Sequence, residues 1–170
     1  MDESVILVDE HDNQIGVEEK LAAHRKALLH RAFSVFVFNS KGELLVQQRA
    51  KGKYHSAGLW TNTCCSHQMP GEETDAAAHR RLQEEMGFDC ALREVGSLLY
   101  KVSFENGLSE HEYDHMLIGH YDGPVERINL EEVEDWKWVD PAELLRDIDI
   151  NPERYTYWFK LSLKNIVSKR

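Results

Sequence analysis

A cysteine and a histidine two positions apart offer the first chemistry in this sequence. Cys65 and His67 lie in the run Asn62-Thr63-Cys64-Cys65-Ser66-His67. In extended backbone alternate side chains share a face, so these two would project together. A thiol beside cations can act as a nucleophile, a base or a metal ligand, whereas a buried cysteine is inert packing. For Cys64 we expect packing, and for Cys65 both interpretations stay open.

Acidic residues supply a second group of candidate ligands. In the segment 110–121 a period of two places Glu110, Glu112 and Asp114 on one face of an expected strand. Three carboxylates on one face repel one another, so they need either a solvated face or a divalent cation. If that face turns inward, a metal is needed to offset the buried charge.

Two of the nine histidines can converge only under one condition. His24 and His30 are six positions apart, which is about 240° around a continuous helix, so their side chains meet only if the helix ends between them. An extended pattern that begins at Arg31 allows this. Imidazoles combined with carboxylates suit Zn²⁺, Mn²⁺ or Fe²⁺ better than Mg²⁺ alone. A single histidine is more often a structural or surface residue, so spacing alone does not decide.

A helix expected over residues 72–86 carries two acids that point in different directions. Glu84 lies about 200° from Leu82 and should face solvent, whereas Glu85 lies roughly 60° from Leu82, at the edge of the buried stripe. Glu85 is therefore the better candidate ligand. Helix physics alone favours a simpler interpretation, in which the acids form i,i+4 salt bridges with Arg80 and Arg81.

Interspersed strands and helices must position these side chains. Strands are expected over residues 5–8, 33–38, 44–48, 98–105, 110–121 and 136–139. Helices are expected over residues 18–29 and 72–86, after the capping box that begins at Asp140, and from Asn151-Pro152 to the C-terminus. The turns 39–42 and 106–107 predict two hairpins, and the loop 49–59 is expected to contact a ligand. These elements predict an α/β sandwich on a mixed sheet, built as one domain of residues 1–170.

Charge and cysteine content limit the partners. Thirty acidic residues against 20 basic ones give a formal charge of -10 at pH 7, which opposes binding to nucleic acid or to an anionic membrane. An anionic substrate would need a local basic cluster. Three cysteines make no disulfide framework, and the most apolar stretch, residues 32–38, is too short to span a bilayer. We expect a reduced, cytoplasmic protein without a nucleic-acid or membrane partner.

Four runs of sequence together carry a resemblance to a known family. They are Leu29-His30-Arg31-Ala32-Phe33-Ser34-Val35-Phe36, Trp60-Thr61-Asn62-Thr63-Cys64-Cys65-Ser66-His67, Glu84-Glu85-Met86-Gly87 and Glu110-His111-Glu112. Over residues 5–169 the chain resembles the type 1 isopentenyl diphosphate isomerases, which have the Nudix fold. The Nudix hydrolase signature is degraded here, because Ser66 replaces its glycine and Arg81 replaces one of its glutamates. The missing glutamate argues against a phosphohydrolase.

The resemblance implies a fold, a reaction and a set of site residues. The fold is a Nudix-like α/β/α sandwich with a mixed sheet, and the reaction is isomerisation of isopentenyl diphosphate to dimethylallyl diphosphate through a carbocation, in isoprenoid biosynthesis. The implied ligands of Zn²⁺ or Mn²⁺ are His24, His30, His67, Glu110 and Glu112, with Mg²⁺ near Glu85. Proton transfer is implied for Cys65 and Glu112 with Tyr100 assisting, diphosphate contact for Lys20, Arg49, Lys53 and Arg81, and a lid over the hydrocarbon for Trp158.

The chain departs from the family pattern at two places, and two other functions compete. Gln68 replaces the proline that usually follows the histidine, and the stretch from His24 to His30 is one residue shorter than in some members. We expect a monomer or weak homodimer. A Nudix hydrolase would release phosphate or a nucleoside monophosphate even after Cys65→Ala. A metal-stabilised binding module would lose stability or metal, but no catalysis, after Glu112→Gln.

Overall fold

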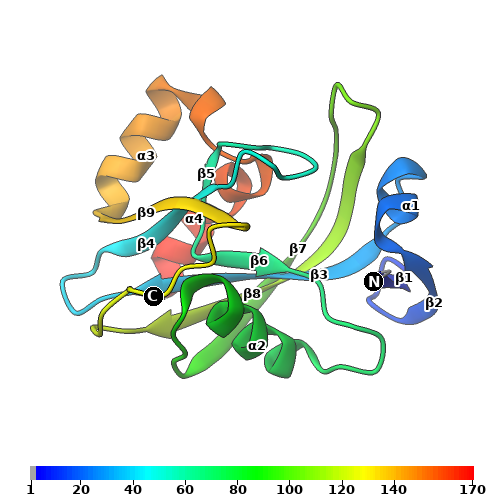
Figure 1. Ribbon diagram of the computed structural model, residues 1–170, viewed down its shortest axis with the longest axis horizontal. Helices are drawn as coiled ribbons and strands as arrows, with labels where there is room; N and C mark the ends of the chain where they lie inside the picture. The colour runs from blue at the N-terminus through cyan, green and yellow to red at the C-terminus, as the bar shows by residue number, and fades with distance from the viewer. Residues whose placement is uncertain (1–2) are drawn as a thin grey trace.

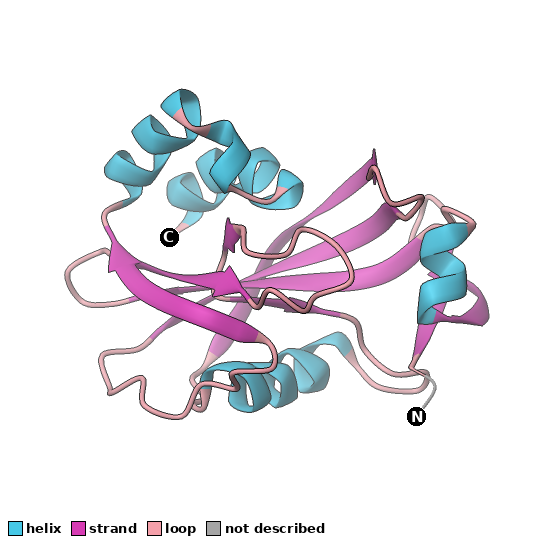
Figure 2. Ribbon diagram, turned by 45° about the horizontal axis from the view of Figure 1, so that its top comes forward, coloured by secondary structure: helices cyan, strands magenta, loops and turns pink. Residues whose placement is uncertain are grey.

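A computed structural model describes residues 3–170, which form a mixed sheet with helices on both faces (Figures 1 and 2). Within these residues the sheet has nine strands. They are β1 (Ser4–Val8), β2 (Gln14–Glu19), β3 (His30–Phe38), β4 (Leu44–Arg49), β5 (Trp60–Thr61), β6 (Cys64–Ser66), β7 (Leu92–Ser103), β8 (Ser109–His120) and β9 (Val133–Val139). The helices are α1 (Lys20–Arg25), α2 (Thr74–Met86), α3 (Pro141–Ile150) and α4 (Tyr157–Lys169), with a 3₁₀ turn, η1, at Pro152–Arg154.

Strand β3 is the centre of this arrangement. It runs parallel to β8 from the pair His30 and Glu112 to the pair Phe38 and His120. On its other side it pairs antiparallel with β6, where Ser34 faces Cys65. The two strands that carry Cys65 and Glu112 therefore flank the same strand.

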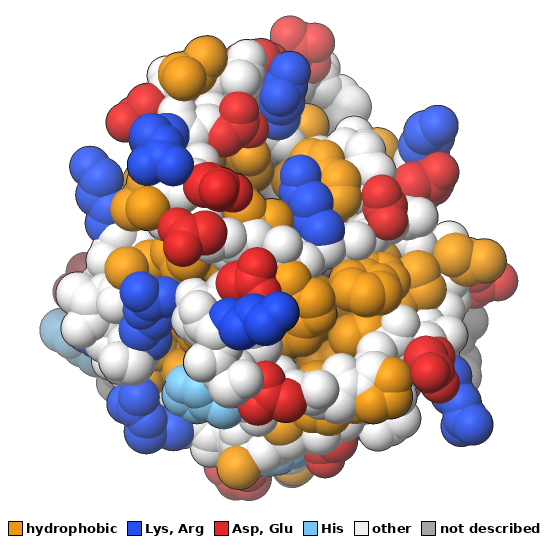
Figure 3. Space-filling view, turned by 90° about the vertical axis from the view of Figure 1, so that its left-hand side faces the viewer, with side chains coloured by type: hydrophobic (Ala, Val, Ile, Leu, Met, Phe, Trp, Pro, Cys, Tyr) orange, Lys and Arg blue, Asp and Glu red, His pale blue; other side chains and the backbone are white. Residues whose placement is uncertain are grey.

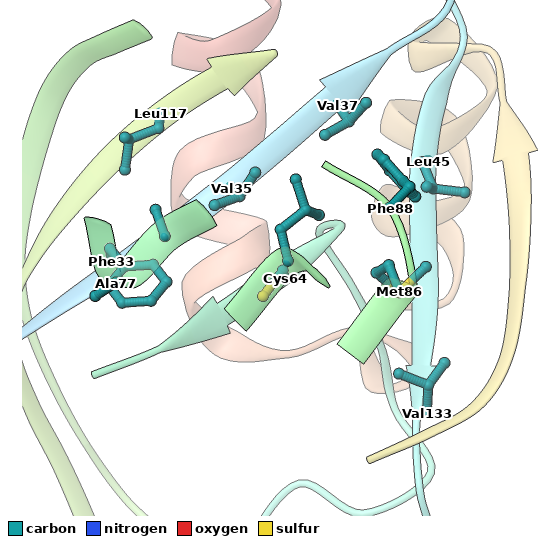
Figure 4. Packing of buried hydrophobic residues seen from close by; sticks show 12 residues of the cluster. Phe33, Val35, Val37, Leu45, Cys64, Ala77, Met86, Phe88, Leu117 and Val133 are labelled. Atoms are coloured by element: carbon teal, nitrogen blue, oxygen red, sulfur yellow. The ribbon is translucent and has the colours of Figure 1, made fainter. Parts of the chain in front are cut away.

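Alternate side chains of β3 enter two separate cores, as the period-two pattern predicts. Phe33, Val35 and Val37 pack with α2, a cluster drawn in Figure 4. Phe36 and Phe38 point the other way and pack against α4. Because both faces are covered by helices, β3 is apolar from Ala32 to Phe38 except at Ser34. The sequence prediction of an α/β sandwich on a mixed sheet is confirmed.

Several predicted element bounds are wrong, each for a local reason. The helix expected over 18–29 is only α1, because residues up to Glu19 form β2 against β1, and Glu19 caps the helix by accepting bonds from Leu21 N and Ala22 N at 2.9 and 2.8 Å. Asn151-Pro152 opens η1 rather than α4, which starts after Thr156. The first predicted hairpin pairs only at Phe38 and Leu44, since the strands then diverge to different neighbours.

Other predicted signals hold. The hairpin of β7 and β8 turns through Asn106-Gly107, although β7 begins earlier than expected. Asp140 caps α3 by accepting from Ala142 N at 2.8 Å, and Gly87 ends α2 in the left-handed conformation at φ +75°. Within residues 3–170 no helix is both long and apolar enough to cross a membrane. On the face in Figure 3, acidic and basic side chains are interspersed rather than sorted into a basic patch.

Candidate active site

A pocket of about 480 Å³ gathers most of the predicted site residues. Its wall includes Lys20, Arg49, Lys53, Cys65, His67, Arg81, Glu85, Tyr100, Glu110, Glu112 and Trp158. His24 and His30 lie behind this wall and are fully buried. Residues from both ends of the chain thus meet where β3 lies between β6 and β8.

The acidic face of β8 turns inward. Glu110, Glu112 and Asp114 are all buried, so the alternative of a solvated acidic face is wrong. Asp114 accepts a hydrogen bond from Ser34 Oγ at 2.7 Å, and burial raises the pKa of its carboxyl to about 7. Burial and the charge of Glu110 also raise the pKa of Glu112. Such a concentration of buried acid calls for compensating positive charge.

Three histidines and Glu112 bring their ligand atoms together. One possible metal-ligand atom from each of His24, His30, His67 and Glu112 lies within 4.8 Å of the other three. His30 Nε2 and His67 Nε2 lie 3.4 and 3.3 Å from the same Glu112 Oε1. The helix ends at Arg25, between His24 and His30, as their convergence requires. The centres of the two imidazole rings lie 5.0 Å apart.

In two of the histidines the ring nitrogen that faces the other ligand residues carries no hydrogen. His24 Nδ1 donates to the Lys20 carbonyl at 2.6 Å, and His30 Nδ1 donates to the Leu28 carbonyl at 2.9 Å. Each Nε2 therefore carries a lone pair. His30 Nε2 is buried and has no hydrogen-bond partner among residues 3–170, and burial lowers the pKa of His30 to about 4. Neutral imidazoles around carboxylates fit a divalent metal ion.

Glu110 and Tyr100 extend this group. The Tyr100 hydroxyl lies 3.0 Å from Glu110 Oε2 and 2.9 Å from Glu112 Oε2, and donates to this pair of carboxylates. Burial opposes the ionised form of Glu110, but the contacts with Glu112, His24 and His55 outweigh it and lower its pKa. Glu110 Oε1 groups with His24 and His55 within 4.8 Å of one another, beside the first four ligands rather than among them.

His55 and Tyr54 are site residues that the sequence reasoning missed. Both line the pocket from the segment between β4 and β5. That segment was expected to contact a ligand, but His55 stands alone in it, without the spacing that singled out other histidines. Lys20 Nζ lies 4.5 Å from the centre of the Tyr54 ring, so this loop also borders the basic end of the pocket.

The two adjacent cysteines have different surroundings. Cys65 lines the pocket, and burial raises the pKa of its thiol to about 12 although Arg49 opposes this rise. The raised pKa keeps Cys65 in its protonated thiol form. Cys64 points into the core with Val35, as predicted, and its Sγ also donates to Glu85 Oε2 at 2.9 Å.

Basic side chains gather at one end of the pocket. Arg80 Nη1 donates to Glu84 at 3.4 Å and Arg81 Nη2 donates to Glu85 at 3.0 Å, so both predicted i,i+4 salt bridges form. Arg81 Nη1 also donates to Glu84 at 2.6 Å. Lys53 pairs with Glu132. Within the described part of the chain, the Nε atoms of Arg49 and Arg81 are buried donors without a partner. Unpartnered guanidinium donors are suited to binding an anion.

An aromatic ring also lines the pocket, beside Arg49, whose guanidinium carbon lies 5.4 Å from the centre of the Trp158 ring. Trp158, near the start of α4, is 3% exposed and lines the cavity. Its Nε1 donates to Asn62 Oδ1 at 3.2 Å, and the Asn62 amide in turn donates to the carbonyl oxygens of Val35 and Cys64. The core thereby fixes the orientation of the indole.

Comparison with known proteins places the chain in a family. Residues 28–159 match the NUDIX domain model. A protein of Deinococcus radiodurans has a solved structure with a TM-score of 0.77 at 20% identity, covering 98% of both chains. The MutT protein from Methanosarcina mazei gives 0.68 at 17% identity, covering 83% of this chain and 94% of that one. At these identities the likeness concerns the fold.

Curated relatives are much more similar in sequence. The Isopentenyl-diphosphate Delta-isomerase 2 of Aromatoleum aromaticum is 53% identical, over 100% of this chain and 89% of the relative. The protein of the same name from Photorhabdus laumondii is 56% identical, over 94% of this chain and 90% of the relative. The chain therefore belongs to the NUDIX domain family and, within it, to the isopentenyl-diphosphate Delta-isomerases.

Proposed function

We propose that this protein isomerises isopentenyl diphosphate to dimethylallyl diphosphate, in isoprenoid biosynthesis. One observation carries the proposal: Cys65 and Glu112, on the two strands that flank β3, line one pocket that also holds unpartnered arginine donors and an indole. The names of the curated relatives support it.

The reaction needs two proton transfers and protection from water. An unactivated alkene gains a proton at one carbon and loses a proton from another, and the tertiary carbocation between these steps would be trapped by water. Trp158 supplies an aromatic face to that cation, and Cys65 and Glu112 supply the two proton-handling groups. Tyr100 holds the Glu112 carboxylate by its hydroxyl.

The diphosphate serves as the handle for binding. Lys20, Arg49, Lys53 and Arg81 would hold it from the wall of the pocket, and Glu85 would hold a Mg²⁺ ion that offsets part of its charge. Arg81 contacts Glu84 and Glu85, where a hydrolase of this fold would have a further glutamate for magnesium. A cation at this position supports anchoring the diphosphate rather than cleaving it.

A second ion, Zn²⁺ or Mn²⁺, belongs to the buried ligand group. His24, His30, His67, Glu110 and Glu112 would hold it. When bound, a divalent cation there offsets the buried carboxylates and tunes their acidity. We further infer a cytoplasmic monomer or weak homodimer, which the three free thiols and the net charge of -10 support.

Deuterium incorporation tests the proposal. Metal-loaded protein incubated with isopentenyl diphosphate in deuterated water should place deuterium in both isomers, followed by NMR. Cys65→Ala and Glu112→Gln should each lower turnover by about 10²–10⁴-fold, because each removes one proton-handling group. Folded, metal-loaded wild-type protein that exchanges no deuterium would contradict the proposal.

A further inference from the structure

A fourth histidine adjoins the metal ligands although neither its spacing nor the family pattern singled it out. The side chain of His55 is 1% exposed, and its Nε2 forms an ion-pair contact with Glu110 Oε1 but has no hydrogen-bond partner among residues 3–170. The same carboxylate oxygen lies 3.4 Å from His24 Nε2. Two imidazoles therefore contact the same oxygen of Glu110.

Packing fixes the His55 ring on all sides. The ring stacks on Phe104 with centroids 4.7 Å apart and planes at 10°. Tyr54 and Trp158 meet it edge-on at 4.4 and 5.8 Å. The His55 carbonyl accepts a hydrogen bond from Arg49 Nη2 at 3.1 Å, which ties the loop to the basic end of the pocket. A buried imidazole held this firmly has few alternative orientations.

The neighbours of its two nitrogens distinguish His55 from the predicted ligands. His24 and His30 direct Nδ1 at backbone carbonyls, which only accept, so their Nε2 atoms are bare. His55 Nδ1 instead lies 3.1 Å from Ser56 Oγ, a hydroxyl that can donate. With Ser56 as the donor to Nδ1, His55 carries its hydrogen on Nε2 and presents it to Glu110. Glu110 Oε1 then faces an N–H on the His55 side and the lone pair of Nε2 on the His24 side.

We propose that His55 is a positioning residue of the metal centre, which holds Glu110 in the orientation for metal binding by donating from Nε2 to Oε1. Tyr100 donates to the other oxygen at 3.0 Å, so both oxygens of this carboxylate are restrained. The proposal rests on the metal centre described above and not on the isomerisation. Partners that orient ligands in this way typically change metal affinity by about 10–100-fold when they are lost.

The test compares three variants of the full chain. His55→Phe keeps a ring that can stack on Phe104 but removes the donor, and His55→Gln places an amide N–H near the position of Nε2. His120→Gln, at the exposed end of β8, is the matched control. The dissociation constants of Zn²⁺ and Mn²⁺ are measured by chelator competition, unfolding temperatures are measured without metal, and the visible spectrum of bound Co²⁺ reports its ligands.

Expected values follow from the positioning role. His55→Phe should bind metal about 10–100-fold more weakly, whereas His55→Gln and His120→Gln should stay close to wild type, with unchanged Co²⁺ spectra. Equal affinity of wild type and His55→Phe would overturn the role of His55 alone. A changed Co²⁺ spectrum in both His55 variants would also overturn it, by making His55 a direct ligand. Wild-type protein that binds neither metal would overturn the metal centre and this proposal together.

Discussion

Replacing Trp158 with leucine should slow catalysis much more than it weakens substrate binding. The indole lines the pocket and is fixed by the bond from Nε1 to Asn62 Oδ1 at 3.2 Å. A desolvated cation–π contact is worth about 2 kcal/mol, and its loss from the transition state corresponds to about a 30-fold fall in kcat. The basic groups that bind the diphosphate remain, so KM should change little.

Trp158→Phe is the matched comparison, because it keeps an aromatic face and loses the Nε1 donor. We expect a decrease in kcat of only a few fold, in line with the loss of one net hydrogen bond of about 1 kcal/mol. Steady-state kinetics with isopentenyl diphosphate measure both variants, and thermal unfolding checks that each is folded. A leucine variant with wild-type kcat, or with an effect confined to KM, would refute the role of the ring in stabilising the cation.

Three further predictions concern stability. Removing bound metal with a chelator should lower the unfolding temperature by about 5–11 °C. A ligand at about 100 times its Kd adds about 2.7 kcal/mol to the free energy of unfolding, and each kcal/mol shifts the unfolding temperature of a domain of this length by about 2–4 °C. An unchanged unfolding temperature would count against a buried metal centre. The hydrogen bond from Arg80 holds the pKa of Glu72 below its ordinary value of 4.5. The ion pair therefore stabilises the fold above pH 4.5, and this contribution is lost as the pH falls further. In urea unfolding between about pH 3 and 6, the free energy of unfolding of Glu72→Gln should fall less with acid than that of the wild type, by less than about 1 kcal/mol. Gly87→Ala should destabilise the fold more than Gly107→Ala, because both glycines have positive φ but of the two only Gly87 is so placed that a Cβ would overlap Arg127. In thermal unfolding we expect Gly107→Ala to lose about 1–2 kcal/mol of stability and Gly87→Ala about 1–3 kcal/mol more. Equal losses in the two variants would contradict the close approach of Arg127 to Gly87.

Much of the fold follows from local patterns in the sequence. Alternation in β3 predicts which side chains enter each core, and the glycine after Met86 predicts where α2 ends. The bounds of α1 do not follow, because residues 14–19 are recruited as a strand by pairing with β1, a contact that local propensity does not record. The early separation of β3 from β4 likewise depends on β6, which takes the same edge of β3 at residues 33–35.

The candidate site divides in the same way. Period two correctly places Glu110 and Glu112 on one face, but only the folded structure shows that this face is buried. The convergence of His24 and His30 could be stated from sequence as a condition, namely a helix end between them. His55 could not be singled out, because its contact with Glu110 depends on the path of the loop between β4 and β5.

The central claim is that the pocket moves a double bond and leaves the diphosphate intact. The most direct measurement follows one reaction of metal-loaded protein and isopentenyl diphosphate by phosphorus and proton NMR together. We predict that proton signals of dimethylallyl diphosphate grow while the phosphorus spectrum keeps two phosphates joined to the carbon chain. Release of orthophosphate, with no dimethylallyl product, would contradict the account and favour a hydrolase.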